Sequence, residues 1–179
     1  MRNIFKAATL ESKFPLLSVE NGCIVSKDAD VTVAFQVELP ELFTVTGIEY
    51  ESIHSSWLKA IKVLPTYSIV HKQDWFTKES YEPDVQKDNL SFLSRSFERH
   101  FNERPFLYHT CYLFLTKTTK ERSRQQSNFN TLCRGFIVPK EIRDKDVIHK
   151  FLESIGQFES IINDSGFIKL RRLTSEEIT

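Results

Sequence analysis

The stretch that decides the fold is Asp88–Thr118, DNLSFLSRSFERHFNERPFLYHTCYLFLTKT. Its first half carries apolar residues at the helical spacing of three or four, Leu90, Leu93, Phe97 and Phe101. Asp88 can cap the start of this helix, and Pro105 disfavours helical geometry at Arg104, where the helix should end. We therefore expect a helix with the Phe97 face packed on the sheet and Arg95 on the solvated side.

The second half, Phe106–Leu115, is a run of apolar and aromatic residues. Alternation along a strand sends neighbouring side chains to opposite faces, and here both faces are apolar. A strand of this kind is covered on both sides. The run therefore predicts a central strand in the interior of the sheet.

Length and composition place limits on the class of protein. A chain of 179 residues and 21.0 kDa fits one domain, spanning 1–179, with a core of its own. Lys plus Arg equals Asp plus Glu at 24 each, so no global charge draws the protein to nucleic acid or an anionic membrane. The odd number of cysteines and the lack of CxxC spacing indicate reduced thiols in a cytosolic protein: Cys23, Cys111 and Cys133. No apolar run approaches the roughly 20 residues of a membrane span.

The N-terminal part of the chain predicts a β-meander. After a segment without periodicity over 1–15, three extended runs follow at 16–20, 23–27 and 31–39. Asn21-Gly22 favours a two-residue hairpin turn, because both central positions need positive φ. The third run alternates apolar and polar residues, which predicts one covered and one wet face.

Capping signals and apolar periodicity place the remaining elements. Thr46 and Glu49 have the spacing of a capping box, and a helix should run from there to about Val63. A strand is expected over 67–76, a last helix over about 145–163 and a final strand over 167–173. The sequence thus predicts an α+β fold: an antiparallel-rich mixed sheet with an N-terminal β-meander, covered by about three helices. A second capping box at 174–177 opens a further helix, so we expect the parent chain to continue beyond Thr179.

No constellation of residues singles out a catalytic centre. The glycines lack the spacing of a phosphate-binding loop, and we assign no catalytic, cofactor-binding or metal-binding residues. His109 and Cys111 share one strand face, which is compatible with two metal ligands, but two further ligands are not evident, and we favour a buried thiol beside a hydrogen-bonded histidine. A cysteine nucleophile with His71 or His100 stays open, because such partners meet in the fold.

A basic stretch follows the central strand over 116–135 and is expected to form a loop. Its cationic side chains are the candidate partner-binding residues: Lys117, Lys120, Arg122 and Arg124. They would contact nucleic acid, acidic lipid or an acidic protein face, and a merely solvated loop is the alternative. A short strand is expected at 136–138, before Pro139.

Three long phrases resemble a known family: KFPLLSVENGCIVSKDADVTVAFQVELPELFTV, IHSSWLKAIKVLPTYSIVHKQDWF and FLSRSFERHFNERPFLYHTCYLFLTKTTKER. Over about 8–138 the chain is similar to the N-terminal domain of the TraG-type ATPase of conjugative transposons, a relative of the VirB-type ATPases of type IV secretion. The resemblance implies a two-part protein, in which a docking domain precedes a RecA-like domain with Walker motifs. This chain ends before such motifs, so ATP and Mg are implied for that further domain and no nucleotide-binding residue is carried onto this one.

The resemblance also implies where the protein works. It predicts a non-catalytic assembly domain in conjugative DNA transfer, cytoplasmic and peripheral to the inner membrane, whose partners are subunits of the secretion apparatus. The full-length protein would form a homo-oligomer, and direct DNA contact is left open. The alternative function is a small standalone cytosolic enzyme that uses a Cys or His residue.

Overall fold

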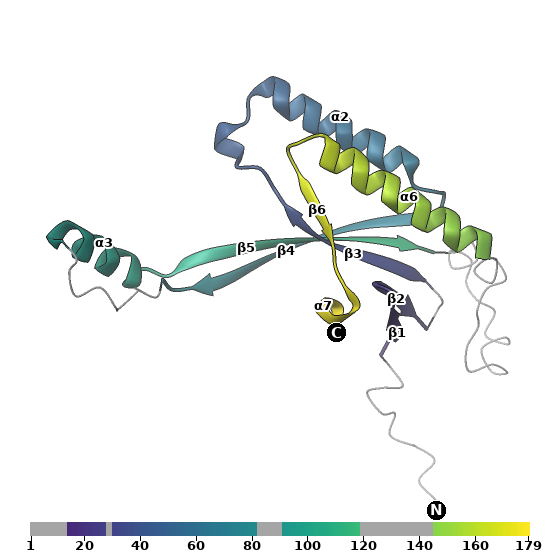
Figure 1. Cartoon of the computed structure of the whole chain (residues 1–179), viewed down its shortest axis with the longest axis horizontal. Helices are drawn as coiled ribbons and strands as arrows, with labels where there is room; N and C mark the ends of the chain where they lie inside the picture. The colour runs from purple at the N-terminus through teal and green to yellow at the C-terminus, as the bar shows by residue number, and fades with distance from the viewer. Residues whose placement is uncertain (1–13, 28–29, 82–90, 119–144) are drawn as a thin grey trace, which may run out of the picture.

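The computed structural model describes residues 14–27, 30–81, 91–118 and 145–179. Its strands form one six-stranded sheet in which every pair is antiparallel, and helices α2 and α6 lie side by side over one face (Figure 1). The strands are β1 (Leu16–Glu20), β2 (Cys23–Ser26), β3 (Val31–Glu38), β4 (Ser68–Glu79), β5 (Phe106–Lys117) and β6 (Lys169–Arg172). The helices are η1 (Leu42–Thr44), α2 (Gly47–Val63), α3 (Phe92–Asn102), α6 (Lys145–Asp164) and α7 (Ser175–Ile178). The α+β prediction with an N-terminal meander is confirmed.

The first hairpin forms at the predicted turn. Asn21 has φ 52° and Gly22 has φ 68°, the positive values that a tight two-residue turn requires. β1 then pairs with β2 and β2 with β3, which completes the meander. The Gly22 amide donates a 2.8 Å hydrogen bond to Ser175 Oγ at the start of α7, so the turn contacts the end of the described chain.

β3 and β5 form the centre of the sheet. The strand order is β1-β2-β3-β5-β4, and β6 pairs with the end of β3 beyond its contact with β2. β3 and β5 pair from Val31 opposite Lys117 to Val37 opposite Cys111. Side chains of both strands on the helix-covered face are buried: Val33, Phe35, Cys111, Leu113 and Leu115. The prediction that Phe106–Leu115 is an interior strand is confirmed for Cys111–Leu115, which lies between β3 and β4, and is wrong for Phe106–Thr110, which pairs with β4 alone among the described strands.

The two covering helices follow their sequence signals closely. Thr46 and Glu49 form the predicted capping box: the Thr46 amide donates to the Glu49 carboxylate at 2.7 Å, and the Glu49 amide donates to Thr46 Oγ1. α6 buries one apolar stripe at helical spacing, Phe151, Ile155, Phe158 and Ile162. Trp57 of α2 meets Phe158 edge to face with ring centroids 5.8 Å apart. The core therefore lies between these helices and the β3–β5 half of the sheet.

The prediction for the helix of Asp88–Thr118 is wrong in its placement. α3 forms, but it lies at the far end of the β4–β5 hairpin, away from α2 and α6 (Figure 1). None of its residues is buried, and Phe97 is 63% exposed instead of facing the sheet. Ser91 caps the helix by accepting a hydrogen bond from the Ser94 amide, whereas the expected cap Asp88 is outside the described residues. Of the three helices expected to cover the sheet, two do so.

The β4–β5 hairpin explains why α3 is remote. The two strands pair continuously from Ser68 opposite Lys117 to Glu79 opposite Phe106, whereas β3 reaches along β5 only to Cys111. Beyond that point the hairpin is a two-stranded ribbon. We call this ribbon (75–79 and 106–110) together with α3 the arm, and the remaining described elements the body.

Other expectations lie outside the described residues. These are the N-terminal segment over 1–13, the strand at 136–138 and most of the basic loop. β5 continues through Lys117, two residues into the stretch expected to be loop. Towards the C-terminal end, Gly166 follows α6 with φ 75°, the left-handed conformation that a glycine adopts when it caps a helix.

Candidate functional site

Four polar or thiol side chains meet where the arm leaves the body. Asp74 of β4 lies directly opposite Cys111 of β5, and its carboxylate accepts hydrogen bonds from Lys72 Nζ and from His109 Nε2, the latter at 2.8 Å. The ring of His109 stacks on Phe76 with centroids 4.7 Å apart. The Lys72 ammonium, and then the His109 hydrogen bond, hold the pKa of Asp74 at about 2, below the ordinary 3.8.

The thiol of this cluster is held in its neutral form. Cys111 is 2% exposed, and its burial raises the pKa of the thiol, with the Asp74 carboxylate acting in the same direction. A cysteine nucleophile needs the opposite, a lowered pKa and an accessible sulfur. His109 is oriented by Asp74, and the environment of Cys111 favours the thiol over the reactive thiolate. The buried thiol beside a hydrogen-bonded histidine, one of the two sequence interpretations, is confirmed.

The two histidines considered as partners of a cysteine nucleophile lie elsewhere. His71 is opposite Phe114 and tilts against its ring at 5.9 Å, so strand alternation puts it on the other face of the sheet from Cys111. His100 is on α3, at the end of the arm, where it meets Phe101. In the described part of the chain no group of three or more His, Cys, Asp or Glu side chains is arranged to hold a metal ion.

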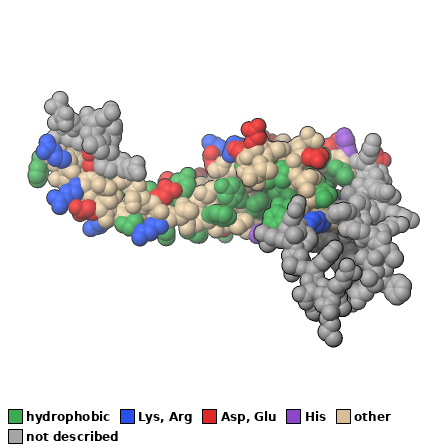
Figure 2. Space-filling view, turned by 90° about the horizontal axis from the view of Figure 1, so that it is seen from below, with side chains coloured by type: hydrophobic (Ala, Val, Ile, Leu, Met, Phe, Trp, Pro, Cys, Tyr) green, Lys and Arg blue, Asp and Glu red, His purple; other side chains and the backbone are tan. Residues whose placement is uncertain are grey.

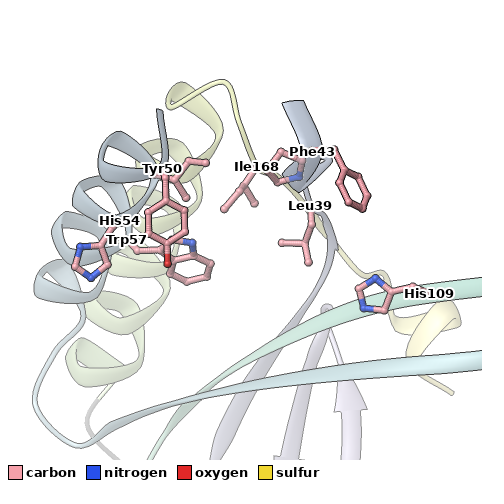
Figure 3. A pocket seen from close by; sticks show the side chains of 9 residues that line it. Leu39, Phe43, Tyr50, His54, Trp57, His109 and Ile168 are labelled. Carbon is pink, nitrogen blue, oxygen red and sulfur yellow. The ribbon is translucent and has the colours of Figure 1, made fainter. Parts of the chain in front are cut away.

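An apolar pocket of about 610 Å³ opens beside this cluster. It lies between the first half of α2, the chain that follows β3, and the middle of β5, with side chains pointing in from each (Figure 3). Its walls are Leu39, Pro40, Phe43, Tyr50, Ile53, His54, Trp57, His109 and Ile168. The volume is in the range of small-ligand pockets, and these walls suit an apolar group such as an aromatic ring. Tyr50, His54 and His109 supply polar atoms at its edge.

Sequence reasoning missed this pocket. Its residues come from four separate segments, and several of them belong to patterns that also describe a packed core, as Ile53 and Trp57 do on α2. The spacing of His109 to Cys111 suggested a pair of metal ligands. In the structure His109 instead contributes to the pocket wall from β5. Only the spatial meeting of α2 with the ends of β3 and β6 reveals the cavity.

The arm exposes large apolar side chains both on α3 and on the ribbon. On α3 these are Phe92, Leu93, Phe97 and Phe101, of which Phe92 is 87% and Leu93 78% exposed. On the ribbon they are Trp75, Phe76, Phe106, Leu107 and Tyr108. Figure 2 shows hydrophobic side chains gathered over the sheet and continuing in smaller groups along the arm, between blue and red charged side chains. Contiguous exposed apolar surface is typical of interaction sites.

The predicted partner-binding cations are described in part. Lys117 ends β5, donates a hydrogen bond to the Thr66 carbonyl and lies 5.7 Å from the centroid of the Tyr67 ring. Tyr67 has φ 62°, and the Thr118 amide also bonds its carbonyl, at 3.0 Å. Lys117 therefore helps to hold the turn before β4. Lys120, Arg122 and Arg124 are outside the described residues, and their binding role stays a prediction.

Comparison with known proteins adds one partial match. The family described as "Domain of unknown function, B. Theta Gene description (DUF3875)" matches residues 3–55. This segment holds the β-meander, η1 and the beginning of α2, and it leaves out β4, β5 and the arm. No curated protein matches the chain. Among the helices that the structure describes, none is long and apolar enough to cross a membrane.

Proposed function

We propose that this chain is a non-catalytic N-terminal assembly domain of a conjugation ATPase, and that the arm docks it on a subunit of the type IV secretion apparatus. The proposal joins two lines of support. The first is the resemblance of about 8–138 to the TraG-type family. The second is the exposed apolar face of α3, which is the observation that carries the docking role.

The chemistry of α3 suits binding to a groove. Leu93, Phe97 and Phe101 recur along one stripe, while Arg95, Glu98 and Arg99 occupy other positions of the same helix. An amphipathic helix of this type binds by laying its apolar stripe into an apolar groove of a partner, anchored by residues one turn apart. Leu93, Phe97 and Phe101 provide such anchors. Placed at the end of a hairpin, α3 reaches beyond the body (Figure 1).

A binding assay with the secretion subcomplex of the same conjugation system tests the docking role. We expect the chain to bind the reconstituted subcomplex, and the double variant Leu93→Ser, Phe97→Ser to weaken binding by at least tenfold with a nearly unchanged melting temperature. Ile48→Ser on α2 is the matched control, because Ile48 is also strongly exposed but belongs to the body. Equal binding by the α3 variant and the wild type would disprove docking through the arm.

Two further measurements address the rest of the proposal. Calorimetry with ATP and Mg should detect no micromolar binding by this chain, and such binding would contradict the non-catalytic assignment. The quadruple change of Lys117, Lys120, Arg122 and Arg124 to Gln should reduce the salt dependence of any binding to single-stranded DNA, anionic vesicles or the subcomplex. If wild type and quadruple variant bind all three alike, the basic stretch is a solvated connector.

A further inference from the structure

β4 is a long edge strand that has neither a proline nor a bulge to protect its edge, although it carries charged side chains. It bonds β5 along one side over all twelve residues of Ser68–Glu79, without a bulge, and no described strand lies on its other side. The strand contains no proline, and four of its large apolar side chains are exposed, Ile69, Val70, Trp75 and Phe76. A long, regular edge with free backbone donors and acceptors is a template for pairing with another strand.

We propose that β4 pairs antiparallel with β4 of a second copy of this chain, about a two-fold axis at Gln73. The two sheets then join into one continuous sheet across the interface. This inference is independent of the proposed function, since it uses the free edge of β4 and leaves the apolar stripe of α3 available.

Symmetry limits the registers that such a pair can adopt. Two identical antiparallel strands in one sheet are related by an axis normal to the sheet, and residues that lie opposite each other point to the same face. The axis must therefore pass midway between the two copies of one residue, and the neighbours of that residue pair symmetrically around the axis. For the middle of β4 the candidates are the five residues from His71 to Trp75.

The register centred on Gln73 is self-complementary in charge and in polarity. Lys72 of each copy lies opposite Asp74 of the other, which places two pairs of opposite charges across the interface. Val70 lies opposite Phe76, and His71 lies opposite Trp75, so apolar and aromatic side chains also meet each other. Each of these contacts occurs twice, and Gln73 meets its own copy at the axis.

The neighbouring registers lose this complementarity. An axis at Lys72 puts two ammonium groups opposite each other, and an axis at Asp74 does the same with two carboxylates. An axis at His71 sets Val70 against Lys72, and an axis at Trp75 sets Asp74 against Phe76. Like charges directly opposite are destabilising, and so is an apolar group facing a charge. Charge complementarity therefore selects Gln73.

The proposed pairing would also stabilise the ribbon of the arm. A two-stranded ribbon is marginally stable on its own in water. In the proposed dimer, the ribbon residues Phe76 and Thr77 of one copy pair with Val70 and Ile69 in the body half of the other copy. Each ribbon gains a third strand and the support of the other body.

Charge reversal with complementation tests the register. By light scattering and sedimentation, we expect the wild type to dimerise reversibly, and Lys72→Asp and Asp74→Lys each to raise the dissociation constant about tenfold or more. Mixing the two variants should restore dimers. One variant is acidic at both positions 72 and 74 and the other is basic at both, so opposite charges face each other across the interface. The Lys72–Asp74 bridge within each chain stays broken. Lys78→Asp is the matched control, since Lys78 faces Ser68 in this register and should have no effect.

Cross-linking gives a second readout that does not depend on charge. In a Cys133→Ser background, Gln73→Cys should form an intermolecular disulfide under mild oxidation, because opposite Cβ atoms lie about 4.5–5.5 Å apart and small shifts bring them to bonding distance. Lys78→Cys in the same background should not. A wild type that stays monomeric at high micromolar concentration, or a mixture that fails to dimerise, would overturn the proposal and leave docking through α3 unaffected.

Discussion

The two halves of β5 have similar sequences and opposite surroundings. Leu113 and Leu115 are at most 1% exposed, whereas Phe106, Leu107 and Tyr108 are 47–68% exposed. The buried half lies between β3 and β4 and beneath α6 and α2, while the exposed half is paired with β4 alone among the described strands. An apolar run therefore indicates a strand that needs cover, but the neighbouring elements decide whether this chain supplies the cover.

The same comparison extends from strands to helices. α3 and α6 both present an apolar stripe at helical spacing. α6 packs over the sheet beside α2, where Phe151 and Phe158 are completely buried. α3 lies at the tip of the hairpin formed by the two twelve-residue strands β4 and β5, and is therefore remote from the body. The body thus buries the stripe of α6 within the chain, whereas the stripe of α3 stays exposed.

The largest expected effect is a loss of core packing in the body. Phe158→Ala should lower the free energy of unfolding by about 3–5 kcal/mol, because it removes buried area and leaves a cavity beside Trp57. Phe97→Ala on the arm should cost less than about 1 kcal/mol, since its ring is already largely exposed. Urea unfolding of both variants measures the difference. Equal penalties would mean that α3 is packed against the body in solution.

The second effect concerns the turn that contacts the end of the described chain. Gly22→Val should cost roughly 1–3 kcal/mol, because a β-branched residue resists φ 68° and its Cβ would lie 3.2 Å from the Leu173 carbonyl oxygen. Gly156→Ala in α6 is a control of opposite sign: nothing lies within 4 Å, and alanine favours the helix by roughly 0.5–1 kcal/mol. Thermal melts of the two variants should move in opposite directions, and an unchanged melting point for Gly22→Val would contradict the turn.

Local signals in the sequence predicted the body well. The Asn21-Gly22 turn, the capping box at Thr46 and the stripe of α6 each depend on a few neighbouring residues, whose physical chemistry is the same in most contexts. The α+β class followed from the order of these elements.

Long-range placement was less accessible from the sequence. The pattern of Leu93, Phe97 and Phe101 identified a helix but could not tell cover supplied by this chain from cover supplied by a partner. The pocket and the Asp74–His109 contact depend on register across β4 and β5, between residues 35 positions apart. The pairing of His109 with Asp74 was thus beyond any local motif, although the strand that carries each residue was predicted.

The smallest effect lies at the boundary between the two regions and depends on pH. The folded pKa of Asp74, about 2, is below its ordinary 3.8, so the ionised carboxylate stabilises the folded protein. This contribution is fully present above about pH 4 and is lost as the pH falls through the folded pKa. Asp74→Asn should therefore be less stable than the wild type near neutral pH, and the gap should shrink between pH 4 and 2.

Urea unfolding at several pH values measures that gap. Glu49 and Glu177 also have lowered pKa values, through their capping contacts, but they titrate in both proteins and cancel in the difference. In a Trp57→Phe background, the fluorescence of Trp75, the residue that follows Asp74, reports on the base of the arm. Trp75 should respond to acid in the wild type and less in Asp74→Asn. A gap that stays constant down to pH 2 would show that the ion pair of Asp74 with Lys72 and its hydrogen bond with His109 contribute nothing to the junction, and that the arm is held to the body by its backbone pairing alone.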